Sequence, residues 1–257
     1  MDDFAFLDTK FVDGLLTLTL KHPPVNVLNI AMLDELGRAL GKAASDESVR
    51  LLLLTGQGEK CFCAGVDVID HAADRVAGML AAFHRVVRRL HDFPVPTVVA
   101  LNGSALGGGL ELALACDMLL AVDEAQLGQP EIRLGVLAPV AAVLLPRRLP
   151  PAIANEMLLG GAPISADQAQ RYGLVNRVWP RALFAAEVRT FIEPYLNLSR
   201  AVQFQNKQTV REAEGMAFNA ALAIAERRYL DELMATSDAQ EGIAAFLEKR
   251  APVWKHW

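Results

Sequence analysis

Residues 102–111 read Asn102-Gly103-Ser104-Ala105-Leu106-Gly107-Gly108-Gly109-Leu110-Glu111, and they directly follow the short apolar run 97–101. An apolar run of this length is typical of a buried strand, and the glycines after it predict a turn into a helix at about 107–116. Glycine lets the backbone approach a ligand closely, and a helix that begins there directs free N–H groups forward. The segment therefore predicts a ligand-facing turn, with Glu111 one turn inside the helix.

A second carboxylate lies twenty residues further along, in Leu127-Gly128-Gln129-Pro130-Glu131, on a segment expected to be irregular. Burying a carboxylate costs folding free energy unless the group is paired with a partner or serves a function in a site. If the fold brings Glu111 and Glu131 together across a pocket, they form a proton-handling pair, which indicates an enzyme. The alternatives are that Glu111 only complements a helix dipole and that Glu131 is a solvated loop acid.

Strands and helices alternate on both sides of the glycine run, which predicts an α/β fold with strands buried on both faces. An N-terminal hairpin is expected over residues 4–20, with its turn at Asp13-Gly14. The further predicted elements are a helix at 30–44, a strand at 49–54, a helix at 73–92, strands at 97–101 and 118–122, and the helix at 107–116 between them.

The pattern changes after about residue 195, where no further strand is evident. One long helical stretch is expected from Ser199 to Met234, followed by a helix at 238–249. Four small or apolar side chains would share one face of the long helix: Ala213, Ala217, Ala220 and Ile224. We therefore predict a core with the active site at 1–195 and a helical region at 196–257 for pocket closure and oligomerisation.

Composition excludes several classes of function. The 257-residue chain has 53% apolar and 21% charged residues, and its net charge of −5 argues against nucleic acid as a partner. The N-terminus has no secretory signal pattern, and no apolar run is long enough to span a membrane. Three cysteines without a disulfide framework indicate a reducing, cytoplasmic location, and Cys61-Phe62-Cys63 is interpreted as structural, with no metal site expected.

A second glycine-bearing turn, Leu54-Thr55-Gly56-Gln57-Gly58, leads to Ala64-Gly65-Val66-Asp67. Two such turns at the same end of a sheet could each offer one N–H to a developing oxyanion. The glycines of residues 107–109 match neither a phosphate-binding P-loop nor a dinucleotide-binding fingerprint.

In combination, these motifs resemble the crotonase (enoyl-CoA hydratase/isomerase) superfamily. The resemblance covers nearly the whole chain, through 64–67, 102–113, Asp117, 128–131, 159–161, 164–166, Ala169, 173–178 and 246–250. It implies a crotonase-type spiral of ββα units with a C-terminal all-helical region, usually assembled as trimers or dimers of trimers.

The resemblance also implies roles for particular residues. The backbone N–H groups of Val66 and Gly108 would hold a thioester oxygen. Glu111 and Glu131 would be the catalytic pair of a hydratase, Glu111 activating water and Glu131 handling the proton of the α-carbon. Many relatives keep only one of these carboxylates or neither, and because this chain keeps both, hydration is favoured over isomerisation.

The implied substrate is an acyl-CoA thioester, so coenzyme A arrives with the substrate and no separate cofactor or metal is expected. It would bind along the backbone of Val25, Ala64, Gly65, Asp67 and Val68. The family often has a lysine two residues after the motif aspartate, where this chain has Ile69, so one phosphate contact is in doubt. None of the five histidines falls in a catalytic motif, and His84 and His91 are interpreted as structural.

Residues 134–146 are bulkier and more apolar than the corresponding run of most hydratases. Together with residues 23–28, they resemble hydratases that act on a cyclic dienoyl thioester, cyclohexa-1,5-diene-1-carbonyl-CoA, in the breakdown of aromatic acids. The alternatives are a straight-chain 2-enoyl-CoA hydratase or an enoyl-CoA isomerase. A catalytically silent relative that binds RNA or acts as a scaffold is a third reading, against which both glutamates and the acidic charge argue.

Overall fold

The computed structural model describes residues 4–256, which divide into two compact units. The first unit contains the chain up to Phe93 and Thr97–Ile192, and the second contains Pro94–Pro96 and the chain from Glu193 onward. The functions predicted for the two parts of the chain stay predictions. Among the described residues, no helix is both long and apolar enough to cross a membrane.

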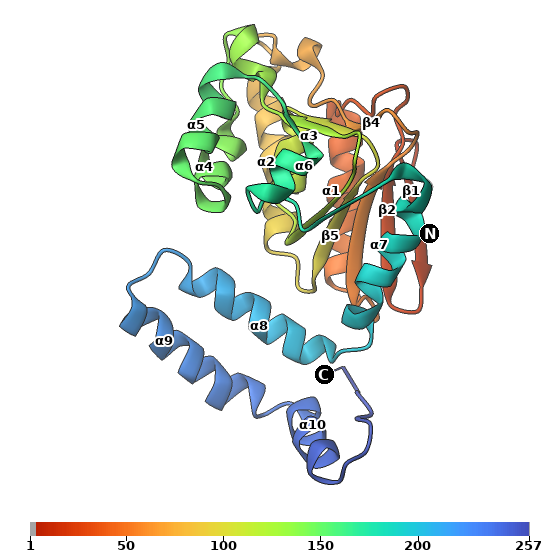
Figure 1. Cartoon of the computed structure of the whole chain (residues 1–257), viewed down its shortest axis with the longest axis vertical. Helices are drawn as coiled ribbons and strands as arrows, with labels where there is room; N and C mark the ends of the chain where they lie inside the picture. Colours follow the sequence, from red (N-terminus) through yellow and green to blue (C-terminus); the bar gives the residue numbers. More distant parts are fainter. Residues whose placement is uncertain (1–3, 257) are drawn as a thin grey trace. The chain divides into compact units, whose positions relative to one another are not determined.

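A six-stranded sheet forms the centre of the first unit (Figure 1). The hairpin strands are antiparallel to each other and all other neighbours are parallel. The hairpin turns at Asp13 and Gly14, whose φ angles of 49° and 84° are those of a tight two-residue turn. In order across the sheet, the strands are β1 (Leu7–Val12), β2 (Leu15–Leu20), β3 (Leu51–Gly56), β5 (Thr97–Leu101), β7 (Met118–Val122) and β10 (Arg177–Trp179).

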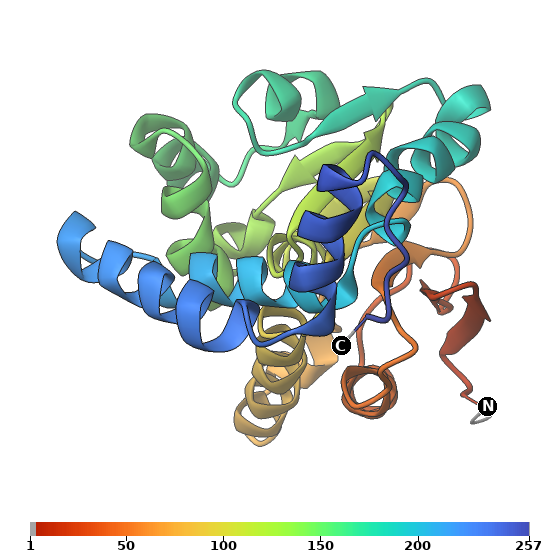
Figure 2. The same ribbon diagram turned by 90° about the horizontal axis from the view of Figure 1, so that it is seen from below.

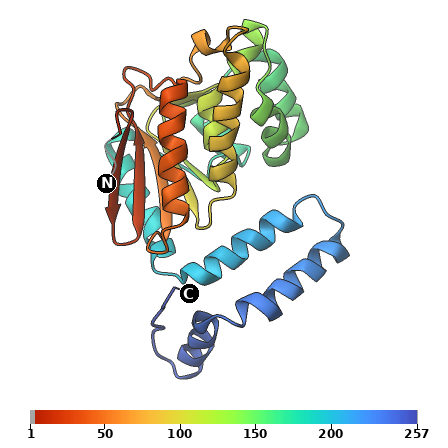
Figure 3. The ribbon, with the colours of Figure 1, turned by 180° about the vertical axis from the view of Figure 1, so that it is seen from behind.

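Helices α1 (Ile30–Ala44) and α2 (Val76–His91) pack side by side in front of this sheet in Figure 3. Helix α1 begins at the predicted residue because Asn29 caps it, its side chain accepting a hydrogen bond from the Met32 amide at 2.8 Å. Its apolar stripe, which includes Leu33 and Leu36, is buried as the periodicity predicted.

A second sheet of four short strands carries the site. It contains β4 (Cys61–Cys63), β6 (Ser104–Leu106), β8 (Gln126–Gly128) and β9 (Ile164–Ser165) in that order. Strands β4, β6 and β8 are parallel to one another, and β9 is antiparallel to β8. No strands were predicted at β4, β6 or β8, because runs of three residues are too short to show strand periodicity.

The two sheets alternate along the chain in three successive turns. Each turn has one strand in the large sheet, one in the small sheet and then a helix: β3-β4-α2, β5-β6-α3 (Gly108–Leu114) and β7-β8-α4 (Pro139–Arg148). This confirms the predicted α/β fold and its spiral of ββα units. The other elements of the first unit are η1 (Val68–His71), η2 (Pro130–Leu134), α5 (Pro151–Gly160), α6 (Ala166–Arg171) and most of α7 (Arg181–Leu196).

The second unit is all-helical, with α8 (Arg200–Ala213), α9 (Phe218–Arg227), the π-helix η3 (Arg228–Leu233) and α10 (Ser237–Leu247). Helices α8 and α9 lie side by side in Figures 1 and 2. The prediction of one continuous helix from Ser199 to Met234 was wrong. Gly215, at φ 74°, adopts the left-handed conformation that ends a helix, so the chain reverses and the four predicted stripe residues do not share one helix face.

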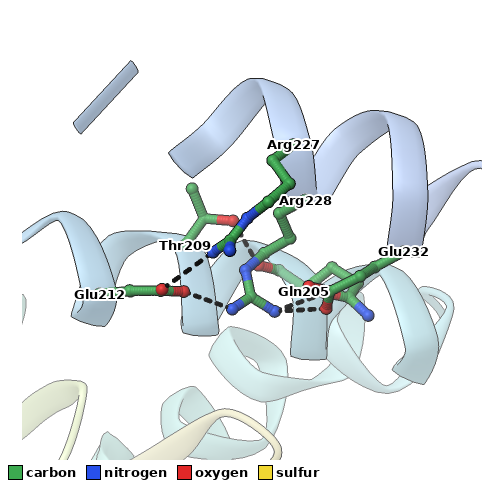
Figure 4. Close-up of polar contacts among 6 residues, drawn as sticks. All are labelled: Gln205, Thr209, Glu212, Arg227, Arg228 and Glu232. Atoms are coloured by element: carbon green, nitrogen blue, oxygen red, sulfur yellow. Dashed lines mark hydrogen bonds and ion pairs between the residues drawn. The ribbon is translucent and has the colours of Figure 1, made fainter. Parts of the chain in front are cut away.

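One arginine, Arg228, joins α8 to η3 in the second unit (Figure 4). The Arg228 guanidinium, whose side chain is only 13% exposed, donates to Glu212 Oε2 of α8 at 2.5 Å and to Glu232 Oε2 at 2.7 Å. It also donates to Gln205 Oε1 at 3.0 Å. Because the planar fork engages two carboxylates and an amide at once, it joins α8 to η3 with fixed geometry.

A buried aspartate holds the end of the chain in this unit. Asp238 is 1% exposed, and its carboxylate accepts hydrogen bonds from the Ser199 hydroxyl at 2.5 Å and from the Lys255 and His256 amides at 2.7 and 2.9 Å. The carboxylate therefore links the start of α8, α10 and the C-terminal segment.

Candidate active site

Three turns of the spiral deliver the predicted site residues to one place. Because β4, β6 and β8 are parallel neighbours, the segments that leave their carboxyl ends lie together at one edge of the small sheet. These segments surround a cavity of about 520 Å³. Seven predicted site residues line it: Ala64, Gly65, Val66, Val68, Gly108, Glu111 and Glu131.

Two free backbone amides lie beside each other at this cavity. Hydrogen bonds on either side of Val66, from Leu28 N–H to Gly65 O at 2.9 Å and from Asp67 N–H to Leu28 O at 3.0 Å, leave the Val66 N–H out of the ladder. Gly108 is the first residue of α3, where N–H groups have no partner within the helix. Within residues 4–256 neither N–H has a hydrogen-bond acceptor.

Close packing of the two backbones keeps these amides adjacent. A Cβ added to Gly108 would lie 3.3 Å from the Val66 nitrogen, and one added to Gly65 would lie 3.3 Å from the Gly108 nitrogen. Gly65 also has a φ of 105°, which side chains disfavour. The arrangement can therefore offer two N–H donors to one oxygen atom, the geometry of an oxyanion hole.

Glu111 is buried against the beginning of α4. It is 4% exposed, and its Oε1 accepts a hydrogen bond from the Ala141 amide at 2.9 Å, in the first turn of a helix that starts with Pro139. Burial raises the pKa of Glu111 to about 7, the Ala141 amide opposes this rise, and the charge of Glu131 adds to it. A carboxyl with this pKa can both accept and release a proton near neutral pH.

Glu131 is the second residue of η2 and is half-buried. Burial raises its pKa, while a backbone hydrogen bond and the charge of His71 lower it. Gln129, which is 1% exposed, holds the carboxylate: with its amide nitrogen turned toward Glu131, it donates to Oε2 at 3.0 Å and to Oε1 at 3.2 Å. The Glu131 carboxylate also lies against Gly107.

The structure thus brings both glutamates to one cavity, where the charge of Glu131 raises the pKa of Glu111. Two carboxyl groups that interact in a partly dry site titrate as a pair, so the proton of one depends on the charge of the other. Beside two free N–H donors, such a pair can move protons at a substrate whose oxygen those donors hold.

Two predicted residues do not line the cavity. Val25 accepts a hydrogen bond from the Ala64 amide at 2.9 Å through its backbone oxygen. Asp67 caps η1, its Oδ1 accepting from the Ile69 amide at 3.0 Å. Both support the segment that forms the cavity wall.

Two other residues of the site were missed by sequence reasoning. Gln129 precedes Glu131 by two residues, and only its burial beside the carboxylate reveals a role. His71 lines the cavity, although it falls in no catalytic motif of the sequence. His84 and His91 lie instead on a separate groove between α2 and α4.

The remainder of the cavity wall is mainly apolar. Helix α2 supplies Val76, Met79, Leu80 and Phe83, and residues 134–139, from the end of η2 to the start of α4, supply Leu134, Val136, Leu137 and Pro139. Half of these eight residues come from the run 134–146, which the sequence shows to be bulky and apolar.

A sequence profile described as enoyl-CoA hydratase/isomerase matches residues 10–256. The chain belongs to the enoyl-CoA hydratase/isomerase family. A cyclohexa-1,5-dienecarbonyl-CoA hydratase of Thauera aromatica is 40% identical over 95% of this chain and 94% of its own length. A 2,3-dehydroadipyl-CoA hydratase of Escherichia coli K12 is 37% identical over 94% of this chain and 95% of its own length.

A solved structure of an enoyl-CoA hydratase from Bacillus anthracis agrees with the fold. The two structures superimpose with a TM-score of 0.93 and are 29% identical in sequence, over 98% of this chain and 100% of the Bacillus anthracis chain. Family membership confirms the predicted fold and the predicted class of enzyme, a lyase of the enoyl-CoA hydratase type that belongs to acyl-CoA metabolism.

Proposed function

We propose that this enzyme adds water to the conjugated double bond of an enoyl-CoA thioester, and that the acyl group is the ring of cyclohexa-1,5-diene-1-carbonyl-CoA. Hydration is supported by one observation: Glu111 and Glu131 line the same cavity, and two free backbone N–H groups lie beside them. The ring is supported by the apolar wall from 134–139 and by the name of the Thauera relative.

In the proposed mechanism, the N–H groups of Val66 and Gly108 hold the thioester oxygen. Polarisation of the carbonyl makes the β-carbon electrophilic and stabilises the enolate-like charge that follows. The pair reacts in the state in which Glu131 carries the proton and Glu111 is ionised. Glu111 then takes a proton from water as the hydroxyl bonds to the β-carbon, and Glu131 gives its proton to the α-carbon. One proton is accepted and one donated, so the pair ends with its single proton on Glu111.

Coenzyme A is proposed to run along the backbone of Val25, Ala64, Gly65, Asp67 and Val68, with no metal and no separate cofactor. Because the catalytic groups named above are side-chain carboxyls and main-chain amides, no step of this mechanism needs another group. A homo-oligomer is also proposed, a trimer or dimer of trimers, which is supported by α9, a helix with no buried residue that exposes Phe218 and Leu222.

The test is an assay of the purified protein with cyclohexa-1,5-diene-1-carbonyl-CoA and with crotonyl-CoA. Addition of one water is followed by loss of the conjugated thioester absorbance and by mass. We expect faster hydration of the cyclic substrate, with a loss of at least about 100-fold in kcat for Glu111→Gln and for Glu131→Gln. Glu156→Gln, an exposed acid of α5, is the matched control and should keep full activity.

Each contrary outcome rejects a stated part of the proposal. Faster turnover of crotonyl-CoA would reject the ring substrate, while the proposal that the enzyme is a hydratase would stand. A double-bond shift without a gain in mass would replace hydration by isomerisation. RNA binding with no turnover of either thioester would reject catalysis.

A further inference from the structure

Asn26 is a fully buried polar residue that takes no part in the mechanism above. Its φ of 52° lies in the left-handed region, which asparagine adopts more readily than most residues. Its Oδ1 accepts a hydrogen bond from the His22 amide at 3.0 Å. Its Nδ2 lies 2.9, 3.2 and 3.0 Å from the backbone oxygens of Gln57, Cys61 and Phe62. Because carbonyl oxygens only accept hydrogen bonds, this surrounding fixes which end of the side chain faces them.

The three carbonyl groups belong to the second glycine-bearing turn of the sequence and to the strand that follows it. Gln57 lies in the turn after β3, and Cys61 and Phe62 are the first two residues of β4. A Cβ added to Gly56 would lie 2.9 Å from Asn26 Nδ2 and 2.5 Å from Phe62 O. Glycine at position 56 therefore leaves the space in which the Asn26 side chain reaches β4.

The neighbours of Asn26 in the chain contact the segment that forms the oxyanion hole. We call residues 25–28 the brace. The Val25 oxygen accepts an amide hydrogen bond at 2.9 Å just after the end of β4. Leu28 pairs with Val66 in a parallel bridge and makes the two hydrogen bonds that flank it, at 2.9 and 3.0 Å. The side chain of Asn26 thus holds the brace at the beginning of β4, and the backbone of the brace holds the segment with the Val66 N–H.

We propose that Asn26 is a positioning residue for the oxyanion hole: by fastening the brace to β4, its side-chain amide fixes the position of the Val66 N–H. The catalytic consequence rests on the proposed function, in which this N–H and that of Gly108 hold the thioester oxygen together. The second donor is held by other contacts, since Gly107 donates to Gly128 O at 2.9 Å just before α3. Loss of the Asn26 side chain therefore displaces one donor and leaves the other in place.

Two variants separate the two ends of the Asn26 side chain. Asn26→Gly permits the left-handed backbone and removes the whole side chain. Asn26→Asp keeps the shape and the acceptor for the His22 amide, but it cannot donate to the three carbonyl oxygens. Asn155→Asp, at an exposed position of α5, is the matched control. Circular dichroism checks that each variant is folded, and Asn26→Gly decides alone if the buried carboxylate of the aspartate variant prevents folding.

The first experiment measures amide hydrogen exchange by NMR in the protein without substrate. In both Asn26 variants we expect the amides of Leu28, Ala64 and Asp67 to exchange at least about 10-fold faster. The amides of Gly107 and Glu111, which belong to the side of the second donor, should keep their rates. Unchanged rates in the first group overturn the proposal, and so does an equal rise in both groups, which is the result of a general loss of stability. Because no turnover is needed, this result stands whether or not hydratase activity is found.

The second experiment uses hydration kinetics and the infrared spectrum of a bound thioester. We expect kcat to fall roughly 10- to 100-fold in both variants with a smaller change in KM, because the Val66 N–H contributes most when negative charge forms on the oxygen. Butanoyl-CoA labelled with ¹³C at its carbonyl has no double bond to hydrate. Its carbonyl stretch, lowered by two N–H donors in the unmodified enzyme, should return toward the value of the free thioester in both variants.

Full activity and an unchanged carbonyl stretch in Asn26→Asp would overturn the proposal, because the hydrogen bond from His22 would then be sufficient. Absence of turnover in the unmodified protein would count against the proposed function alone.

Discussion

The carboxylate of Glu131 lies directly against Gly107: a Cβ added to Gly107 would lie 2.5 Å from Glu131 Oε1. Gly107 precedes α3, has a φ of 53°, and its own amide donates to Gly128 O at 2.9 Å. The glycine therefore joins the turn before α3 to the end of β8 and leaves space for the carboxylate. Any side chain at this position has to displace Glu131.

Gly107→Ala is expected to lower kcat for hydration by about 100-fold, because a displacement of about 1 Å in a catalytic group can cost that much. The protein should remain folded, as judged by circular dichroism. Gly78→Ala is the control, since a Cβ at this exposed position of α2 would meet no atom within 4 Å. Equal activity of Gly107→Ala and the unmodified enzyme would show that the position of Glu131 is not critical.

Removing the buried acid Glu111 is expected to stabilise the protein at high pH. The folded state raises the pKa of Glu111 from its ordinary value of 4.5 to about 7, so it binds a proton that the unfolded chain has already lost in this range. The folded protein therefore loses stability as the pH rises from about 4.5 to about 7, by up to roughly 3 kcal/mol for this group. In Glu111→Gln this position has no titratable group, so the variant does not lose this part of its folding stability as the pH rises.

Denaturant unfolding of both proteins at pH 5 and pH 8 measures this effect. The stability of Glu111→Gln relative to the unmodified protein should increase between the two pH values. Glu156→Gln, which removes an exposed acid, should show no such increase. A pH-independent difference for Glu111→Gln would contradict the raised pKa.

Gln129→Met should reduce hydration by roughly 10- to 100-fold, mainly through kcat. Methionine has a similar volume but cannot donate to the Glu131 carboxylate, so the acid loses both its orientation and two hydrogen bonds. Gln126→Met, at an exposed position of the neighbouring strand β8, is the matched control. A change in KM with kcat intact would indicate that Gln129 shapes the binding pocket instead of positioning Glu131.

Asp238→Ala is expected to destabilise the helical unit by about 3 kcal/mol. The change leaves the Ser199 hydroxyl and the Lys255 and His256 amides without their charged acceptor. Thermal unfolding and hydrogen exchange of the C-terminal segment measure the effect, with Asp231→Ala, at an exposed position of η3, as the control. Unchanged protection of residues 250–256 would show that other contacts hold the segment.

Local patterns were sufficient to predict five strands of the large sheet and the helices α1 and α2 beside it, but not the three-residue strand β10. Helix α1 was predicted at its observed bounds, since a capping asparagine and an apolar stripe are local features. The long C-terminal helix was predicted wrongly because a single glycine, tolerated inside a helix at moderate cost, here ends one. The three-residue strands of the small sheet could not be predicted, because pairing with distant strands defines them.

By itself, the sequence determined the residue types of the site and the order in which they occur: two glycine turns and two carboxylates within about eighty residues. Only the tertiary structure decided that β4, β6 and β8 lie next to one another, which places the ends of three separate segments around one cavity. It also decided the burial that raises the pKa of Glu111, the position of Gln129 beside Glu131, and the presence of His71 on the same cavity. The physical reason is that desolvation and charge interactions depend on distances in space, whereas helix caps and apolar stripes depend on neighbours along the chain.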